Sequence, residues 1–177
     1  MICTQRYESP LGGILLAADE VGLIGLWFDR AKYCADGLPA EHTKRETPIL
    51  TCAKCWMDIY FSGREPDFTP PLNPAGSAFR RAVWDILLQL PYGTTASYGE
   101  IARRLAAQTG TGRVSAQAVG GAVGHNPISV IIPCHRVAGT NGSLTGYAGG
   151  IERKIGLLTL ERADMRHLFV PGTGTAL

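Results

Sequence analysis

The stretch NPISVIIPCHRV, residues 126–137, contains an apolar run that ends at a cysteine followed by a histidine. The run is too short to span a membrane, and Pro127 and Pro133 at its ends favour a buried, extended segment. Such a rigid approach would fix the position of the Cys134 sulfur, so we interpret Cys134 as a candidate nucleophile. The competing interpretation is a structural cysteine beside a surface histidine, because free cysteine is among the most buried residue types.

The adjacency of Cys134 and His135 limits how the two groups could cooperate. In extended backbone, neighbouring side chains point to opposite faces, so the thiol and the imidazole would not contact each other directly. We therefore expect a water molecule or a local turn to connect them. A cysteine hydrolase that uses the pair directly is a poor alternative, because no orienting partner is visible nearby.

Composition and cysteine content indicate a globular protein with one domain or two small ones. The chain has 177 residues, 45% of them hydrophobic, and no long apolar segment, so no membrane association is expected. Five cysteines without framework spacing favour a reducing compartment, which suggests the cytoplasm. Cys52 and Cys55 form a lone C-x-x-C pattern, for which we expect core-facing side chains rather than a metal or redox site.

The charge is distributed unevenly along the chain. Residues 1–75 contain seven basic and ten acidic residues, a net charge of −3, whereas residues 76–177 contain ten and five, a net charge of +5. Nine of those ten basic residues are arginine, the side chain best suited to phosphates and base edges. The second part is therefore the better candidate for binding nucleic acid, although a charge of this size is also typical of a solvated surface.

Hydrophobic periodicity predicts an α/β protein, with a small N-terminal antiparallel sheet-plus-helix domain and a mostly helical C-terminal domain. Strands are predicted at 2–8, 13–18 and 22–29. A helix should begin at Thr47-Pro48 and end near Gly63. Its predicted apolar face consists of Ile49, Cys52, Trp56 and Ile59. The proline-rich linker 64–76 sets the predicted domains at 1–75 and 76–162, with a loose tail at 163–177.

Three serines predict the helix starts of the second domain. Ser77 precedes an apolar helical stripe, Ser97 opens a Ser-x-x-Glu capping box, and Ser115 opens a short helix that Gly124 can end. The last two helices form a helix-turn-helix outline. The Gly120-Gly121 pair in the final helix costs about 1 kcal/mol of helix propensity per glycine, which either close approach to DNA or tight packing against another helix would explain.

The closing helix, which begins at Ile151, places a carboxylate among apolar residues. At 100° per residue, Glu161 falls within the apolar arc, and so does Lys154. A buried carboxylate needs a dedicated hydrogen-bond partner, whereas a glutamate at a frayed helix end would reach solvent.

Five motifs in one order resemble the O6-alkylguanine-DNA alkyltransferases, also called methylated-DNA–protein-cysteine methyltransferases, over residues 79–161. The motifs are SYGE at 97–100, AVGGA at 118–122, NP at 126–127, PCHRV at 133–137 and TGYAGG at 145–150. The resemblance implies direct repair, in which the alkyl group of O6-alkylguanine in duplex DNA is transferred irreversibly to Cys134, once per molecule. It implies no cofactor and no metal, and O4-alkylthymine is left open as a second substrate.

The resemblance also implies roles for individual residues. His135 takes the thiol proton through a water molecule, and Glu161 orients the imidazole. Tyr98 protonates the departing guanine, and Asn126 bridges the helix-turn-helix to the active-site stretch. The substrate pocket and DNA contacts are assigned to Tyr147, Ala148, Gly149, Ala118, Gly120 and Gly121.

Gln117 departs from the family pattern, in which an arginine at this position intrudes into the base stack. A glutamine can fill the vacated space and bond to the orphaned base, but it carries no charge. Arg113 and Arg136 are the candidate compensators. The main alternative function is a non-enzymatic binder of alkylated DNA, which the intact cysteine motif disfavours. A helix-turn-helix regulator would not explain the buried thiol, and a monomer is the default expectation.

Overall fold

The computed structural model describes residues 1–172, which divide into two compact units. The first unit comprises Met1–Ala75 together with Pro127–Ile131, and the second comprises Gly76–Asn126 together with Ile132 onward. The apolar stretch 127–131, which we expected to belong to the C-terminal domain, is therefore part of the first unit. The reason is that Leu26 N donates to Pro127 O at 2.9 Å, and Ser129 N donates to Leu26 O at 3.0 Å.

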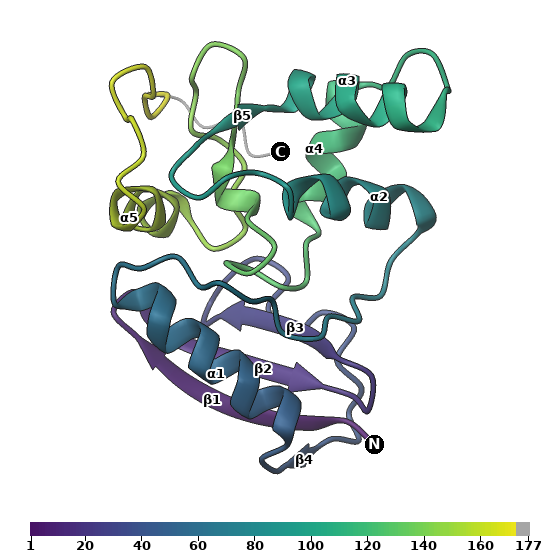
Figure 1. Ribbon diagram of the computed structural model, residues 1–177, viewed down its shortest axis with the longest axis vertical. Helices are drawn as coiled ribbons and strands as arrows, with labels where there is room; N and C mark the ends of the chain where they lie inside the picture. The colour runs from purple at the N-terminus through teal and green to yellow at the C-terminus, as the bar shows by residue number, and fades with distance from the viewer. Residues whose placement is uncertain (173–177) are drawn as a thin grey trace. The chain divides into compact units, whose positions relative to one another are not determined.

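The first unit is a four-stranded sheet with one helix on its face (Figure 1). Strands β1 (Cys3–Ser9), β2 (Gly12–Ala18) and β3 (Leu23–Phe28) are antiparallel and lie within a residue or two of the predicted ranges. Sequence patterns did not predict the short β4 (Thr43–Lys44), which pairs in parallel with β1. The sheet order is β3-β2-β1-β4.

Helix α1 (Pro48–Phe61) begins as predicted, because Thr47 Oγ1 accepts from Leu50 N and Pro48 occupies the first turn. Its predicted apolar face was wrong by about one position. The buried residues are Leu50, Ala53, Trp56, Met57 and Tyr60. Cys55 is exposed and Cys52 is half-buried, so the expectation of two core-facing cysteines is also wrong.

The second unit packs three helices around a buried tryptophan. Helices α2 (Ala78–Leu87), α3 (Tyr98–Thr109) and α4 (Ala116–Gly124) have the predicted caps Ser77, Ser97 and Ser115, and Ser97 forms the full capping box with Glu100. Trp84 Nε1 on α2 donates to Ala122 O on α4 at 2.9 Å, which fixes one helix against the other. The helix-turn-helix outline is thus present as α3, a turn at 110–115, and α4 (Figure 1).

The remaining elements of the second unit surround the cysteine. A 3-10 turn, Cys134–Arg136, is followed by β6 (Val137–Ala138), which pairs in parallel with β5 (Ala96–Ser97). This pairing brings the first residue of α3, Tyr98, toward the cysteine turn across almost forty residues of sequence. Helix α5 (Ile151–Leu160) ends with Glu161 as its C-cap.

The segment after α5 is not the loose tail that we expected. Ala163, Met165 and Leu168 pack against a buried cluster that includes Leu158. Phe169 N also donates to Gly142 O at 3.0 Å, and Leu144 N donates to Phe169 O at 2.8 Å. These apolar and backbone contacts hold the segment through Phe169, and the last part of the predicted tail, 173–177, lies outside the described residues.

Candidate active site

The Cys134 sulfur is held at the end of a tightly turned backbone, not at the end of an extended strand. Val130 has φ +69°, and Cys134 N donates to Ile132 O at 2.8 Å. The predicted extended backbone at Cys134 is therefore wrong, because residues 134–136 form a 3-10 turn. A local turn, one of the two connections we considered, relates Cys134 to His135.

Asn126 fixes the sulfur from the end of α4. Its Nδ2 donates to Ile132 O at 2.9 Å and to Cys134 Sγ at 3.1 Å, and its side chain is buried. Asn126 follows α4 by two residues, so one amide ties the end of that helix to the cysteine turn. This is the position that the family resemblance implied for a bridging residue.

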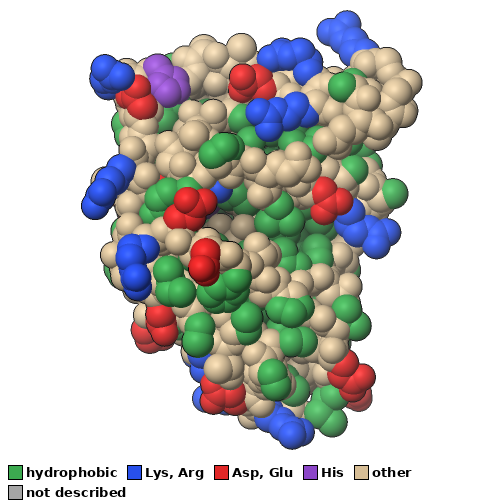
Figure 2. Space-filling model, in the orientation of Figure 1, with side chains coloured by type: hydrophobic (Ala, Val, Ile, Leu, Met, Phe, Trp, Pro, Cys, Tyr) green, Lys and Arg blue, Asp and Glu red, His purple; other side chains and the backbone are tan. Residues whose placement is uncertain are grey.

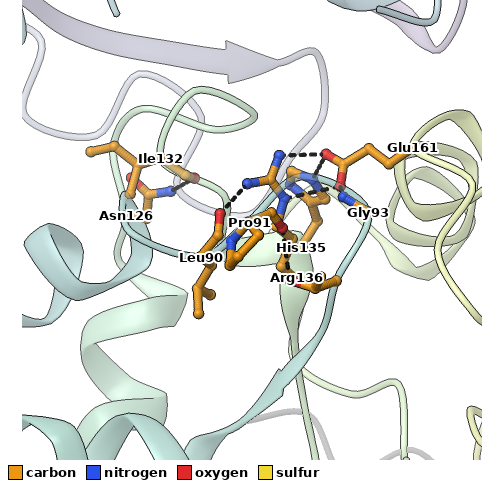
Figure 3. A network of polar contacts seen from close by, with 9 residues as sticks. Leu90, Pro91, Gly93, Asn126, Ile132, His135, Arg136 and Glu161 are labelled. Atoms are coloured by element: carbon orange, nitrogen blue, oxygen red, sulfur yellow. Dashed lines mark hydrogen bonds and ion pairs between the residues drawn. The ribbon is translucent and has the colours of Figure 1, made fainter. Parts of the chain in front are cut away.

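Glu161 is the centre of a buried network that includes His135 and Arg136 (Figure 3). His135 Nε2 lies 2.6 Å from Glu161 Oε1. Arg136 binds the same carboxylate with two bonds, Nε to Oε2 and Nη2 to Oε1, both 2.9 Å, and Gly93 N donates to Oε2 at 3.1 Å. The carboxylate therefore has the dedicated partners that its burial requires.

The pKa shifts in this network favour an ionised Glu161 and a neutral His135. Burial opposes ionisation of Glu161, but its bonds to His135 and Arg136 outweigh that effect and lower its pKa. Burial lowers the pKa of His135 and outweighs the opposing attraction of Glu161. A neutral imidazole that donates Nε2–H to Glu161 has Nδ1 as its basic nitrogen, so His135 is prepared to accept a proton there.

Arg136 is an internal support of Glu161, which corrects its assignment as a DNA contact. Its side chain is 10% exposed, and Nη1 donates to Leu90 O at 2.7 Å in addition to the two bonds to Glu161. These three bonds hold the guanidinium in the interior of the protein and away from its surface. Of the two arginines considered as compensators for Gln117, only Arg113 is exposed.

Lys154 is a buried cation to which sequence analysis assigned no role. Its side chain is fully buried on α5, and Nζ donates to Val137 O at 2.5 Å and to Thr145 O at 3.0 Å. Burial lowers its pKa to about 8, while attraction to Cys134 opposes that shift. The sequence signal for its burial was its place in the same arc of the helical wheel as Glu161, and both side chains are indeed buried.

The thiol itself is protonated in this environment. Burial raises the pKa of Cys134, while the hydrogen bond from Asn126 and the positive charge of Lys154 act in the opposite direction. A thiolate nucleophile would need a lowered pKa, whereas the pKa of this thiol is raised. Asn126 and Lys154 are the groups that favour its thiolate form.

Tyr98 and the glycine-rich loop 145–150 adjoin this centre. Tyr98 OH donates to Thr145 O at 3.3 Å, the same carbonyl that Lys154 binds. Burial raises the pKa of Tyr98 to about 12, so the phenol keeps its proton at neutral pH. In the loop, a Cβ added to Gly149 would lie 2.6 Å from the Tyr147 ring, so glycine there permits close packing of that ring. Ala148 is half-buried.

The exposed side of α4 consists of small residues around Gln117. Ala116, Ala118 and Gly121 are exposed with Gln117, whereas Gly120 is buried. A Cβ added to Gly121 would have no atom within 4 Å, so packing inside the protein does not require glycine there. Tight packing therefore explains Gly120, which is buried. Gly121 instead leaves an open surface that a large ligand could approach closely.

Acidic and basic side chains are interspersed on the face shown in Figure 2, with hydrophobic side chains between them and no large patch of one sign. Within residues 1–172, no group of three or more His, Cys, Asp or Glu side chains could hold a metal ion. No helix in that range is long and apolar enough to cross a membrane. The thiol network is therefore the site on which we base the chemistry.

Comparison with known proteins identifies two matching family models. Residues 2–74 match the ribonuclease-like domain of 6-O-methylguanine DNA methyltransferase, and residues 78–163 match its DNA binding domain. A methylated-DNA–protein-cysteine methyltransferase from Haemophilus influenzae is 39% identical over 88% of this chain and 84% of its own. One from Methanosarcina acetivorans is 42% identical over 88% and 95%.

A solved structure is similar to most of the chain. The crystal structure of Mycobacterium tuberculosis OGT in complex with DNA has a TM-score of 0.76 and 38% identity, and the match covers 91% of this chain and 92% of that one. The sequence motifs, the buried thiol network and these matches agree. The chain therefore belongs to the 6-O-methylguanine DNA methyltransferase family.

Proposed function

We propose that the protein repairs DNA directly, by transferring the alkyl group of O6-alkylguanine in duplex DNA to Sγ of its own Cys134. The observation that carries this proposal is the contact of the Asn126 amide with a buried thiol whose neighbour, His135, is a neutral imidazole backed by an ionised Glu161. A soft sulfur nucleophile suits attack on a saturated carbon, and the relay supplies a proton acceptor.

The proposed transfer accounts for every proton, bond and electron pair. The thiol proton passes through a water molecule to His135 Nδ1, and the thiolate attacks the alkyl carbon. As the S–C bond forms, the C–O6 bond breaks and its electron pair stays on the guanine, which takes a proton from Tyr98. The proton on His135 then returns to the tyrosinate through solvent. The net result converts the thiol and O6-alkylguanine into a thioether and guanine.

Each buried group has a part in this sequence. Glu161 keeps Nε2 of His135 protonated, so that Nδ1 is the accepting nitrogen, and its negative charge stabilises the imidazolium. Lys154 and Asn126 stabilise the thiolate before attack. Tyr98, with its raised pKa, is a proton donor that remains protonated at neutral pH. Because a thioether forms and no group within residues 1–172 is placed to cleave it, each molecule reacts once.

The alkylated base must leave the duplex before it can reach the sulfur. Gln117 projects from the exposed face of α4, where its amide can occupy the vacated space and bond to the orphaned base. The small residues beside it, Ala118 and Gly121, permit close approach of the duplex to the helix. The loop residues Tyr147, Ala148 and Gly149 are the proposed wall of the base pocket.

The proposed partner is duplex DNA, and the proposed active form is a monomer, since one chain supplies every group of the relay. The free state of all five cysteines fits a reducing compartment such as the cytoplasm. O4-alkylthymine presents a similar alkyl–oxygen bond to the sulfur. Competition between the two lesions for a limiting amount of protein would measure whether it is a substrate.

Intact-mass spectrometry after incubation with an O6-methylguanine duplex tests the proposal. We expect one added methyl group per protein, and peptide mapping should find it on Cys134. Cys134→Ala should abolish the gain, whereas Cys55→Ser, which removes an exposed thiol on α1, should leave it unchanged. Tight binding of the lesion duplex without any mass gain would instead identify a lesion-binding protein and overturn the proposed transfer.

A further inference from the structure

Two grooves of the second unit share one residue, Arg103 on α3. The first groove, of about 720 Å³, lies between α3, the turn at 110–115 and the start of α4, and its lining includes Arg113 and Gln117. The second, of about 360 Å³, lies beside β5 and β6. Arg103 lines both, and it was not among the residues that sequence analysis or the family motifs singled out.

The Arg103 guanidinium extends back toward the first turn of α3. A Cβ added to Gly99 would lie 3.6 Å from Arg103 Nη1 and 3.8 Å from Thr140 Oγ1, both ordinary contact distances. A guanidinium, a hydroxyl and the positive end of a twelve-residue helix therefore surround one small space, which the missing side chain of Gly99 leaves open. These groups together favour an anion.

The Glu100 carboxylate also lines the second groove, and it forms no ion pair with Arg103. Glu100 accepts from Ser97 N at 2.6 Å and thereby completes the capping box. Neither the Arg103 nor the Arg113 side chain forms an ion pair or hydrogen bond within residues 1–172. Two unneutralised guanidinium groups thus line one groove, next to the exposed face of α4 that carries Gln117.

We infer that Arg103 binds a phosphate of the DNA backbone where the strand passes the start of α3, with Thr140 as a second donor. The contact supplies, through the backbone, a positive charge that Gln117 does not bring to the base stack. Arg113, at the other end of the same groove, binds a second phosphate. The inference relies on the proposed function only in taking duplex DNA as the ligand.

The salt dependence of DNA affinity tests this inference. Fluorescence anisotropy would give the affinity for an unmodified duplex at several salt concentrations, for the wild type and for Arg103→Ala. Loss of one phosphate contact should weaken binding about tenfold at low salt. The slope of log K against log salt concentration should become shallower by about 0.9, the contribution of one neutralised phosphate.

Arg104→Ala is the matched control, since Arg104 is the next residue of the same helix, is exposed, and lines neither groove. It removes the same charge and should leave the slope unchanged. Arg103→Lys should keep most of the slope, because an ammonium also neutralises a phosphate. Equal slopes for Arg103→Ala and Arg104→Ala would overturn the inference.

A second readout separates this inference from the proposed reaction. Arg103→Ala should transfer the methyl group of the free O6-methylguanine base at the wild-type rate, because the base alone has no phosphate; a rate loss equal to that in duplex DNA would contradict a phosphate contact. Affinity for unmodified DNA does not require any transfer. If the wild type failed to become methylated, the proposed reaction would be refuted. The salt dependence of DNA binding would still decide whether Arg103 binds a phosphate.

Discussion

The two units each contain an arginine bound to a carboxylate by two parallel bonds, and the pairs differ chiefly in their surroundings. Arg6 and Asp29 in the sheet are joined by bonds of 2.8 and 2.5 Å, and their side chains are 45% and 39% exposed. Arg136 and Glu161 are joined by two bonds of 2.9 Å at 10% and 0% exposure. The first pair is exposed to solvent, and the second is buried beside the His135 imidazole.

The difference in exposure determines what each ion pair can do: the exposed pair is a surface contact, and the buried pair controls the ionisation of Glu161. An exposed pair gains little, because water solvates both charges well when they are apart. A buried pair is costly to form and more costly to break, and its value here is that it keeps Glu161 ionised against His135. Four variants and two changes of pH would break or sharpen this comparison.

Replacing Glu161 should have the largest effect. Glu161→Ala leaves the Arg136 charge buried without its carboxylate and His135 without its orienting acceptor. We expect a loss of about 3–5 kcal/mol in the free energy of unfolding. We also expect a transfer rate lower by about a hundredfold or more, since His135 loses the carboxylate that fixes its tautomer and stabilises its imidazolium. Urea unfolding and single-turnover transfer measure the two effects.

Glu161→Gln keeps the shape of the side chain and removes only its charge. It should recover part of the stability lost in Glu161→Ala but little of the transfer rate. If Glu161→Ala transferred methyl groups at the wild-type rate, the carboxylate would be structural only.

Removing the buried ammonium should slow the reaction with little cost in stability. In Lys154→Met the thiolate loses a positive neighbour, and the transfer rate should fall about tenfold for each unit by which the thiol pKa rises. The matched surface control is Lys44→Met, on exposed β4, which should change neither quantity. An unchanged pH–rate profile in Lys154→Met would exclude the electrostatic role.

Lys154 also predicts a rise in stability at high pH. Its pKa is about 8 in the folded chain and 10.5 in the unfolded one, so between these values the unfolded chain binds more protons. The penalty of burying the charge is therefore present below pH 8 and is relieved as the pH rises toward 10.5. We expect the wild type to gain up to about 3 kcal/mol relative to Lys154→Met in that window, as measured by urea unfolding.

Acid should weaken the buried network in two steps. The pKa values of His135 and Glu161 are both lowered by folding from 6.5 and 4.5. Stability is then fully present above those values and is lost as the pH falls, first through protonation of His135 and then of Glu161. Urea unfolding from about pH 8 down to about pH 2 should show this loss in the wild type, and Glu161→Gln should lack the lower step.

Breaking the exposed pair should have the smallest effect. Arg6→Gln should change the free energy of unfolding by less than about 1 kcal/mol and leave methyl transfer unaltered. Thermal unfolding and single-turnover transfer check both statements. A loss as large as that of Glu161→Ala would remove the contrast between the two pairs.

Local sequence signals predicted much of this structure. Ser77, Ser97 and Ser115 each precede a helix and bond to the amides of its first turn, a geometry confined to four or five residues. The three long strands follow alternation and turn residues in the same local way. Helical periodicity also placed Glu161 on the buried side of α5, and the family motifs drew attention to Cys134.

Other features depend on contacts that no local pattern encodes. The stretch before Cys134 contains a left-handed Val130, and residues 134–136 form a 3-10 turn, whereas the sequence pattern predicted one extended segment. Arg136 was interpreted as a surface charge, because sequence shows the charge but not the buried carboxylate that binds it. Lys154 was set aside, since a lysine is rarely fully buried and its two carbonyl partners come from separate segments.

The sequence by itself determined the helix caps, the first hairpins, the reactive cysteine and the family, because each depends on residues close together in the chain or on a motif. Only the tertiary structure decided the charge states of the site. A pKa depends on burial and on the partners within a few ångströms, and here those partners come from α4, the cysteine turn, α5 and the loop at Gly93. The fold assembles them, and their desolvation makes Glu161 ionised, His135 neutral and the Cys134 thiol protonated at rest.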